Sequence, residues 1–367
     1  MAVEAQELTC REGRIGLLTL NAPSSLNALT EAMIEQASTA LTAWADDPAI
    51  HLVVLRGAGD RAFCAGGNIR SLYNAMTGHG DAQAPKRFFT REYQLDYQIH
   101  RFPKPVIGLG HGIIMGGGLG LMAACRYRVV SPNVTLAMPE ISIGLFPDVG
   151  ASWFLNRLPG RLGLFMGLTG ARLNVADAIR VGLADMILEK DQFDDLLARL
   201  QDERWTGEPA ADDNRLFRLL HQLDAVDYRA LAPGNLERHE QAIARIMAGD
   251  DLAAIIDRLV ASENNDPWWQ TCVSTLRHGC PMTACLVWHQ LQKGQQMSLK
   301  DVFRMELAMA IECTRRPDLA EGIRALLVEK DNAPRWHHAS VAEVPEAEIL
   351  AHFEPVWDDQ TDPMQLD

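Results

Sequence analysis

The first half of the chain alternates short apolar runs with helix-like stretches, and this alternation limits the folds open to it. The apolar runs are rich in branched side chains: RIGLLTL (14–20), HLVVLRG (51–57), KPVIGLG (104–110) and YRVVS (127–131). Short continuous apolar runs bounded by Gly, Pro or Asp are typical of strands that are buried on both faces. The four runs therefore predict strands of one buried sheet.

A helix is predicted between the first two runs. In residues 30–47 one helical stripe carries Met33, Ile34, Ala37, Leu41 and Trp44. Thr30 precedes this stripe and is a suitable N-cap. Strand, helix and strand at this spacing predict a right-handed crossover between parallel strands, and so an α/β core.

The pattern changes after about residue 200. The stretch QDERWTGEPAADDNR (201–215) is polar and is a boundary candidate. Helix-like segments then replace strand-like ones, at residues 235–248, 251–262, 281–293, 299–313 and 319–329. We predict an α/β core over residues 1–203 and a helical C-terminal region over residues 204–367.

Charge and cysteine usage exclude some classes of protein. The formal net charge of −14 over 367 residues argues against nucleic acid as the main partner. No apolar run approaches the roughly 20 residues of a membrane span, so no membrane partner is expected. Seven dispersed cysteines indicate reduced thiols. Because the N-terminal residues also lack a secretory signal pattern, a cytoplasmic location is predicted.

Two carboxylates stand in an otherwise apolar segment, PEISIGLFPDVG (139–150). They are Glu140 and Asp148. Burying an uncompensated carboxylate is costly or forces its protonation, so a functional role would explain why these two side chains lie in an apolar segment. The structural alternative makes Asp148 a helix N-cap and Glu140 a packing residue.

Two glycine turns are candidates for an anion site. GLGHGIIMGGGLGLMAAC (108–125) places three successive glycines between a strand and a helix, without the spacing of a dinucleotide fingerprint or the Lys of a P-loop. RAFCAGGNI (61–69) is a second such turn. A pair of bare N–H groups from two turns would stabilise a carbonyl oxygen that gains negative charge. Close packing of helix against strand is the alternative interpretation.

Other kinds of site have weaker support. His278, Cys280, Cys285 and His289 do not have the spacing of a common zinc site, so no metal is predicted. No G-x-S-x-G elbow is present for a serine hydrolase. His111 lies beside the glycine run, where a structural role is expected for it.

Together these motifs resemble the crotonase (enoyl-CoA hydratase/isomerase) superfamily. The likeness begins at NAPSSLNALT (21–30) and continues through GDRAFCAGGNIRSLY, KPVIGLGHGIIMGGGLGL and MPEISIGLFPDVGASWFLNRLPG. It ends in RRPDLAEGIRALLVEKDNAPRW (315–336), a motif of the superfamily's hydrolase branch. The resemblance covers most of the chain. It implies a crotonase-like ββα spiral core with a helical C-terminal region.

The resemblance also implies a site for an acyl-CoA. It places the two oxyanion N–H groups at Gly67 and Gly117 and the working carboxylates at Glu140 and Asp148. It places Glu92 in the substrate pocket. The other positions that it implies for substrate binding are Asn27, Ala28, Ala65, Asn68 and Gly116. The hydrolases usually carry Asp where this chain has Asn68, which leaves the local turn geometry and the acyl group open.

The reaction that the resemblance implies is hydrolysis of a 3-hydroxyacyl-CoA thioester, most specifically of 3-hydroxyisobutyryl-CoA, as in valine catabolism. Hydratases of this fold use a second Glu where the chain has Gly120, which cannot transfer a proton. A hydratase or isomerase and a non-catalytic CoA-binding scaffold are the alternatives.

In the hydrolase reaction, Glu140 acts either as a nucleophile or as a general base. Asp148, which is desolvated by its apolar neighbours, donates a proton or holds the substrate hydroxyl. No cofactor is expected, since CoA is part of the substrate. Assembly into a homo-oligomer is left open.

Overall fold

The computed structural model describes residues 2–224, 226, 228, 231–355, 357 and 361–366. Contacts divide the chain into two compact units, each built from separate segments. The first contains Met1–Gly67, Leu95–Leu136 and Leu173–Glu237, and the second contains Asn68–Gln94, Ala137–Arg172 and Arg238–Asp367. The division at residues 203 and 204 stays a prediction about function, since the compact units do not follow it.

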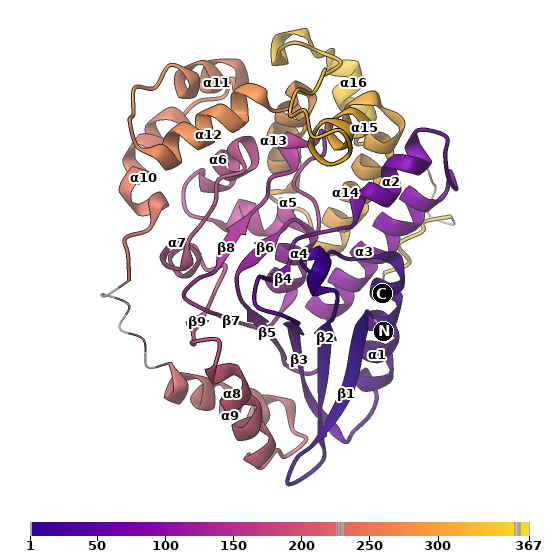
Figure 1. The fold of residues 1–367 in the computed structure, drawn as a ribbon, viewed down its shortest axis with the longest axis vertical. Coiled ribbons are helices and arrows are strands. Elements are labelled where there is room, and N and C mark those ends of the chain that lie inside the picture. The colour runs from indigo at the N-terminus through magenta and orange to yellow at the C-terminus, as the bar shows by residue number, and fades with distance from the viewer. Residues whose placement is uncertain are drawn as a thin grey trace. The chain divides into compact units, whose positions relative to one another are not determined.

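A six-stranded sheet is the frame of the first unit (Figure 1), in the order β1-β2-β3-β5-β7-β9. β1 pairs with β2 in antiparallel register, and every other neighbouring pair is parallel. The strands are β1 (Val3–Thr9), β2 (Arg14–Leu20), β3 (Ile50–Gly57), β5 (Val106–Gly110), β7 (Tyr127–Val130) and β9 (Met186–Ile187). The four predicted strands are β2, β3, β5 and β7, which are consecutive in the sheet, so the predicted α/β core is confirmed.

β1 was not predicted, and its sequence explains why. VEAQELT has no apolar run, and four of its seven residues are exposed in succession. A strand at the edge of a sheet pairs through its backbone on one side and needs no continuous apolar face. The hydropathy pattern therefore gives no signal for it.

The predicted first helix is α1 (Glu31–Ala45). The hydroxyl of Thr30 accepts a hydrogen bond from the N–H of Met33 at 3.2 Å, as an N-cap does. All five residues of the predicted apolar stripe are buried. Both the helix and its N-cap are thus confirmed.

The remaining helices of the first unit are α4 (Gly117–Ala124), α7 (Val175–Arg180), α8 (Gln192–Asp202) and α9 (Pro209–Leu223). Two of them, α8 and α9, pack on the sheet. Side chains of α8 and α9 share one core cluster with residues from β2, β3, β5 and β7. Trp205, inside the polar stretch taken as a boundary candidate, is only 1% exposed and belongs to this cluster.

A smaller sheet carries the two glycine turns. It contains β4 (Ala62–Cys64), β6 (Ile113–Met115) and β8 (Thr135–Ala137), in the order β4-β6-β8. β4 and β6 are parallel, with Ala62 opposite Ile113 and Cys64 opposite Ile114. The carboxyl ends of these two strands consequently lie at the same edge.

The second unit is mostly helical (Figure 1). Its first helices are α2 (Ile69–Met76), α3 (Ala84–His100, which continues into the first unit), α5 (Ala151–Phe154) and α6 (Leu162–Thr169). They are followed by α10 (Asn235–Ile246), α11 (Leu252–Val260), α12 (Pro267–His278), α13 (Pro281–Gly294), α14 (Leu299–Arg315), α15 (Pro317–Ile323) and α16 (Glu346–Ala351). A π-helix over Arg324–Val328 extends α15. The predicted helical C-terminal region is confirmed.

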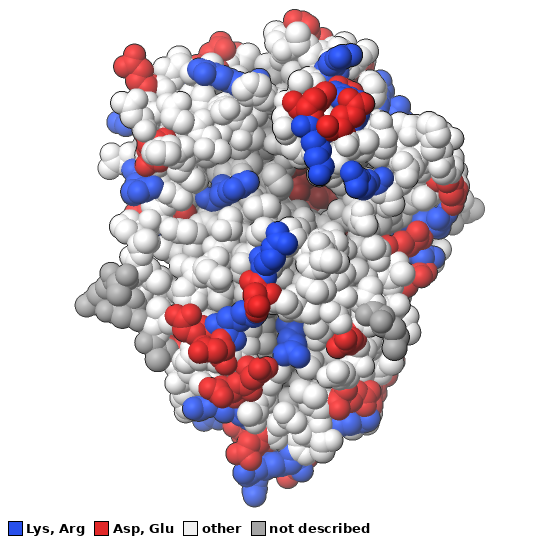
Figure 2. Space-filling view, in the orientation of Figure 1, with Lys and Arg blue, Asp and Glu red and all other residues white. Residues whose placement is uncertain are grey.

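On the face that Figure 2 shows, acidic and basic side chains are interspersed rather than gathered into one basic surface. Among the described residues, no helix is both long enough and apolar enough to cross a membrane.

Candidate active site

The two glycine turns follow neighbouring parallel strands. Ala65, Gly66 and Gly67 come directly after β4, and Gly116 and Gly117 come directly after β6. Because β4 and β6 are parallel neighbours, both turns leave the same edge of the small sheet. The structure thereby brings together the two turns that the sequence predicted as an oxyanion site.

The turns approach too closely for side chains. Gly66 has φ +101°, and a Cβ atom there would lie 3.1 Å from the carbonyl oxygen of Met115 and 3.5 Å from the nitrogen of Gly117. A Cβ on Gly118 would lie 2.2 Å from the carbonyl oxygen of Cys64, closer than any real contact. Only glycine fits where α4 begins against β4. Helix–strand packing, the alternative interpretation, is therefore part of the reason for these glycines.

The N–H groups of Gly67 and Gly117 are the predicted donors. Gly117 is the first residue of α4, where a backbone N–H has no partner within the helix. Within the part of the chain that the structure describes, no carbonyl accepts a hydrogen bond from either N–H. Both donors are thus available to an oxyanion, as the predicted chemistry requires.

Asn27 holds the neighbouring loop in place. Its side-chain nitrogen donates to the carbonyl oxygens of Ala58 and Ala62, each at 2.9 Å, and its side-chain oxygen accepts from the N–H of Ala22. The backbone N–H of Ala65 donates to Leu26 at 3.0 Å. The segment around Asn27 and Ala28 is in this way joined to the turn at residues 65–67. These contacts give the side chain of Asn27 a positioning role in the loop.

Asn68 directly precedes α2, and its side chain makes no capping hydrogen bond to the helix. Its carbonyl oxygen accepts the hydroxyl of Ser71 at 2.8 Å.

Three predicted carboxyl groups lie in the second unit and are buried. Glu92 lies on α3, Glu140 begins a single 3₁₀ turn (Glu140–Ser142), and Asp148 precedes α5. They are 2%, 5% and 4% exposed. One oxygen of Glu92 and one of Glu140 have no hydrogen-bond partner among the described residues. Unpaired buried carboxyl groups of this kind are rare outside functional sites.

The three groups influence one another's protonation. Burial, with Asp148 nearby, raises the pKa of Glu92 and the pKa of Glu140 well above their usual range. Burial also raises the pKa of Asp148, to about 6, although the hydrogen bond from Tyr93 lowers it. Such a cluster loses its protons in shared steps rather than group by group.

Tyr93 was not singled out from the sequence. Its side chain is fully buried, and its hydroxyl donates to Oδ2 of Asp148 at 2.7 Å. A hydrogen bond to the charged form stabilises it, so Tyr93 favours the Asp148 carboxylate. The only signal in the sequence is that Tyr93 directly follows Glu92.

The turn after Asp148 has an unusual backbone. Val149 has φ +54°, a left-handed conformation that costs a β-branched residue roughly 1–3 kcal/mol. Two buried side chains hold this turn. Glu306 on α14 accepts the N–H groups of Gly150 and Ser152 at 2.7 and 2.8 Å. Gln290 on α13 donates to the carbonyl oxygen of Pro147 at 2.8 Å.

Glu306 was also missed, although a signal for it exists. It lies on the apolar stripe of α14, four residues after Val302 and three before Met309, where the period of a helix calls for a hydrophobic side chain. It is fully buried. Burial raises the pKa of Glu306 to about 8, against the hydrogen bonds from Ser152 and Gly150, which lower it.

The C-terminal motif packs against the loop that carries Glu140. A Cβ on Gly144 would lie 2.6 Å from the backbone of Asp318, and a Cβ on Gly322 would lie 2.3 Å from the carbonyl oxygen of Ile143. The N–H of Cys280 donates to Ile141 at 2.9 Å. Residues more than 130 positions apart therefore shape one loop.

Cysteine and histidine nucleophiles are not favoured. Burial raises the pKa of Cys10 and Cys285 to about 11 and the pKa of Cys125, Cys272 and Cys280 to about 12, so these thiols stay protonated. Burial lowers the pKa of His111 to about 4. The carboxyl cluster is the stronger candidate for the chemistry.

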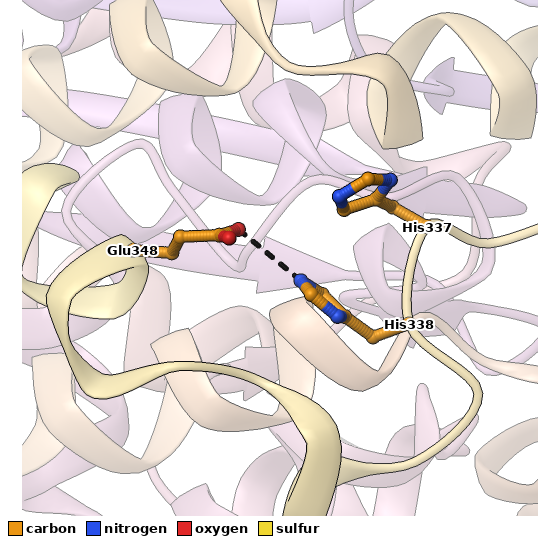
Figure 3. Close-up of side chains that lie close together, drawn as sticks. All are labelled: His337, His338 and Glu348. Carbon is orange, nitrogen blue, oxygen red and sulfur yellow. Dashed lines mark hydrogen bonds and ion pairs between the residues drawn. The ribbon is translucent and has the colours of Figure 1, made fainter.

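One group of side chains in the described residues resembles a metal site. Figure 3 shows His338 pointing toward Glu348, with Nε2 3.1 Å from the carboxylate oxygen, and His337 beside it. Arg316 lies 3.8 Å from the same oxygen. The hydrogen bond from His338 lowers the pKa of Glu348, so ion pairing accounts for the group. The set His278, Cys280, Cys285 and His289 does not converge in this way among the described residues.

Comparisons with known proteins identify the family of the chain. Residues 15–353 match a family model described as enoyl-CoA hydratase/isomerase. A mitochondrial 3-hydroxyisobutyryl-CoA hydrolase of Gallus gallus is 34% identical over 352 residues, 96% of this chain and 89% of the relative. The protein of the same name from Homo sapiens is 35% identical over 345 residues, 94% of this chain and 87% of the relative.

Solved structures share the fold. An enoyl-CoA hydratase from Rhodobacter sphaeroides 2.4.1 superposes with a TM-score of 0.83 at 34% identity, over 97% of this chain and 98% of that one. A carnitinyl-CoA dehydratase from Mycobacterium thermoresistibile gives a TM-score of 0.84 at 34% identity, over 97% of both chains. The crotonase-like fold implied by the sequence motifs is confirmed.

The predicted cytoplasmic location is wrong on this comparison, because the relatives from chicken, zebrafish and human are all named as mitochondrial. The prediction rested on dispersed cysteines and on the lack of a secretory signal pattern. Reduced thiols separate reducing from oxidising compartments and do not distinguish one reducing compartment from another.

Proposed function

The chain belongs to the enoyl-CoA hydratase/isomerase family, and we propose on that basis that it hydrolyses 3-hydroxyisobutyryl-CoA to 3-hydroxyisobutyrate and CoA. The observation that carries the proposal is the cluster of Glu92, Glu140 and Asp148, whose pKa values are all raised by burial. Buried carboxyl groups with raised pKa values suit proton transfer at neutral pH. CoA enters as part of the substrate, and no cofactor is needed for the reaction.

The thioester carbonyl is assigned to the N–H groups of Gly67 and Gly117, which stabilise its oxygen as negative charge develops. One such donor contributes roughly 2.7–4 kcal/mol. A new C–O bond forms from water, or first from the Glu140 carboxylate, and the C–S bond breaks. The CoA thiolate then takes a proton.

The carboxyl cluster supplies what these steps require. Glu140 has to be ionised to attack or to accept a proton from water. Asp148 has to be protonated to donate, or to hold the hydroxyl of the substrate. The pKa directions place the first negative charge of the free protein on Asp148 and the proton on Glu140, so the working form is the singly ionised cluster in which that proton has moved from Glu140 to Asp148.

Turnover should therefore rise with pH as the cluster loses its first proton, in the range of the Asp148 pKa of about 6. Tyr93→Phe removes a hydrogen bond that lowers the pKa of Asp148, so the rising limb should move to higher pH. The measurement is kcat against pH from 4.5 to 9 for both proteins.

Tyr127→Phe is the matched control for this change. The hydroxyl of Tyr127 donates to Asp213 at 2.9 Å. The variant therefore loses a hydrogen bond of the same kind, but between two residues that have no catalytic assignment. Its pH profile should stay that of the parent. A Tyr93→Phe profile that does not move would contradict a role for the Asp148 proton in turnover.

A hydratase is the second candidate, since the two solved structures described above carry names of enzymes that add or remove water. Hydratases of this fold use a Glu at the position that Gly120 occupies on α4. Glycine has no group that transfers a proton. This observation favours hydrolysis.

A panel of acyl-CoA esters tests the reaction type. Purified protein should release free thiol from 3-hydroxyisobutyryl-CoA and should hydrate crotonyl-CoA poorly, which is followed by the loss of enoyl absorbance. Hydration faster than thiol release would refute the hydrolase assignment. No turnover of either class would instead support a CoA-binding scaffold.

A further inference from the structure

Glu306 contributes to the site from the C-terminal helical region without belonging to the carboxyl cluster. It lies on α14, 156 residues beyond Gly150 in the chain. It is fully buried, and its two oxygens accept two different backbone N–H groups, those of Gly150 and Ser152. These are the second and fourth residues after Asp148. A buried carboxyl at this place thus fixes the backbone on the carboxyl side of a proposed catalytic residue.

That backbone needs fixing because Val149 is held at φ +54°. A β-branched residue in the left-handed region would relax if its surroundings allowed it. Glu306 holds the chain immediately after Val149, and Gln290 holds it immediately before Asp148, at Pro147. A rotation of Val149 toward ordinary dihedral angles would change the backbone next to Asp148, whose carboxyl accepts from the hydroxyl of Tyr93.

Packing from the same helix supports this arrangement. Phe303 lies one turn before Glu306, and a Cβ on Gly150 would be 3.2 Å from its ring. The ring of Phe303 also lies 6.0 Å from the ring of Tyr93, centre to centre. One helix therefore contacts both the turn that carries Asp148 and the side chain that donates to it.

We propose that Glu306 is a positioning residue for Asp148: by holding the N–H groups of Gly150 and Ser152 it keeps the strained turn at Val149 in the form that places the Asp148 carboxyl for its reaction. The proposal rests on the proposed function, in which Asp148 carries a proton during thioester hydrolysis. It adds a residue from the C-terminal helices to that machinery, acting through Asp148 and without touching substrate.

The test is Glu306→Gln. The amide offers one acceptor oxygen and presents its NH₂ group to the second N–H, so one of the two bonds is lost with little change in size. We expect kcat to fall about 10- to 100-fold, as misplacement by about 1 Å does, with KM changed less than about threefold. The pKa of Asp148 should rise as its bond from Tyr93 weakens. It is measured by carboxyl ¹³C NMR of Asp-labelled protein and assigned with Asp148→Asn.

Asp212→Asn is the matched control. Asp212 is buried and accepts hydrogen bonds from the N–H groups of Thr206 and Gly207 at 2.8 and 2.9 Å. It thus holds two backbone N–H groups as Glu306 does, but in a loop whose residues have no catalytic assignment. Both variants should lower the melting temperature. Only Glu306→Gln should change kcat and the Asp148 titration, because a purely structural role moves neither.

A double-mutant comparison decides whether Glu306 acts through Asp148. In an Asp148→Asn background, Glu306→Gln should lower kcat by less than about threefold further. Equal losses in both backgrounds would overturn the proposal, as would a folded Glu306→Gln protein with parental kcat and an unchanged Asp148 titration. If Glu306→Gln does not fold, Glu306→Asp, which keeps the carboxyl but is too short to reach both N–H groups, is compared in the same way.

The NMR titration separates this proposal from the proposed function. If no 3-hydroxyacyl-CoA is hydrolysed by the parent protein, the proposed substrate is wrong. An Asp148 titration that shifts in Glu306→Gln and not in Asp212→Asn would still support positioning. An unshifted titration would refute it, whatever the substrate.

Discussion

Replacing Glu140 by glutamine should lower turnover by roughly a hundredfold or more, the scale of a lost general base. The change keeps the size of the side chain and removes both its basicity and its nucleophilicity. Glu140 is buried and one of its oxygens has no partner in the described structure, so no structural bond of that atom is broken. Binding of the acyl-CoA should be largely retained. Rapid-quench measurement of thiol release and calorimetric binding check the two expectations.

Asp148→Asn should also impair turnover, and its loss should not add to that of Glu140→Gln, since both groups act on one substrate. Single-turnover hydrolysis in heavy-oxygen water separates the two routes open to Glu140. An anhydride route can leave label on its carboxylate, and a water-activation route cannot. A Glu140→Gln protein with the parental rate would show that this carboxyl is not the reacting group.

Gly117→Val should cost turnover at least a hundredfold as well, the loss expected for one oxyanion donor. Gly117 begins α4 beside the turn at Gly66, and its nitrogen would lie only 3.5 Å from a Cβ atom added at Gly66. A branched side chain here would exclude the thioester from its donors. The measurement is kcat/KM for thiol release.

Thermal unfolding is the control for this variant, because added volume in a closely packed turn also destabilises the fold. Gly117→Ala, which adds a single carbon, is the second variant if the valine protein does not fold. A folded variant with near-parental activity would place the thioester carbonyl elsewhere.

Hydrophobic patterning predicted the central elements well because burial on both faces leaves a continuous apolar run. β2, β3, β5 and β7 have such runs, and α1 has a clear stripe and an N-cap. β1 is polar and exposed, so no pattern marks it. The discontinuous compact units were equally hidden, because a local pattern does not report which distant segments pack together.

The site follows the same division. Glu140 and Asp148 could be identified because a charged residue within an apolar run is visible in the sequence itself. The structure shows that both are buried. Tyr93 was invisible, since a tyrosine in a helix is ordinary until its hydroxyl is seen on Asp148. Glu306 was overlooked although it interrupts the stripe of α14. Its partners are backbone N–H groups, which carry no mark in a sequence.

The hold of Glu306 on Gly150 has a consequence for the order in which the protein matures during synthesis. A ribosome makes the N-terminal part of a chain first, and folding proceeds as segments emerge. Asp148 is synthesised 156 residues or more before Glu306, the side chain that fixes its turn. Gly144 and Ile143 are separated by a still longer stretch of chain from Asp318 and Gly322, the residues that pack against them. A nascent chain can therefore complete its parallel sheet well before its catalytic loop takes its final form. Premature termination anywhere before residue 306 should yield a protein that lacks the reactive geometry, however much of its sheet has folded.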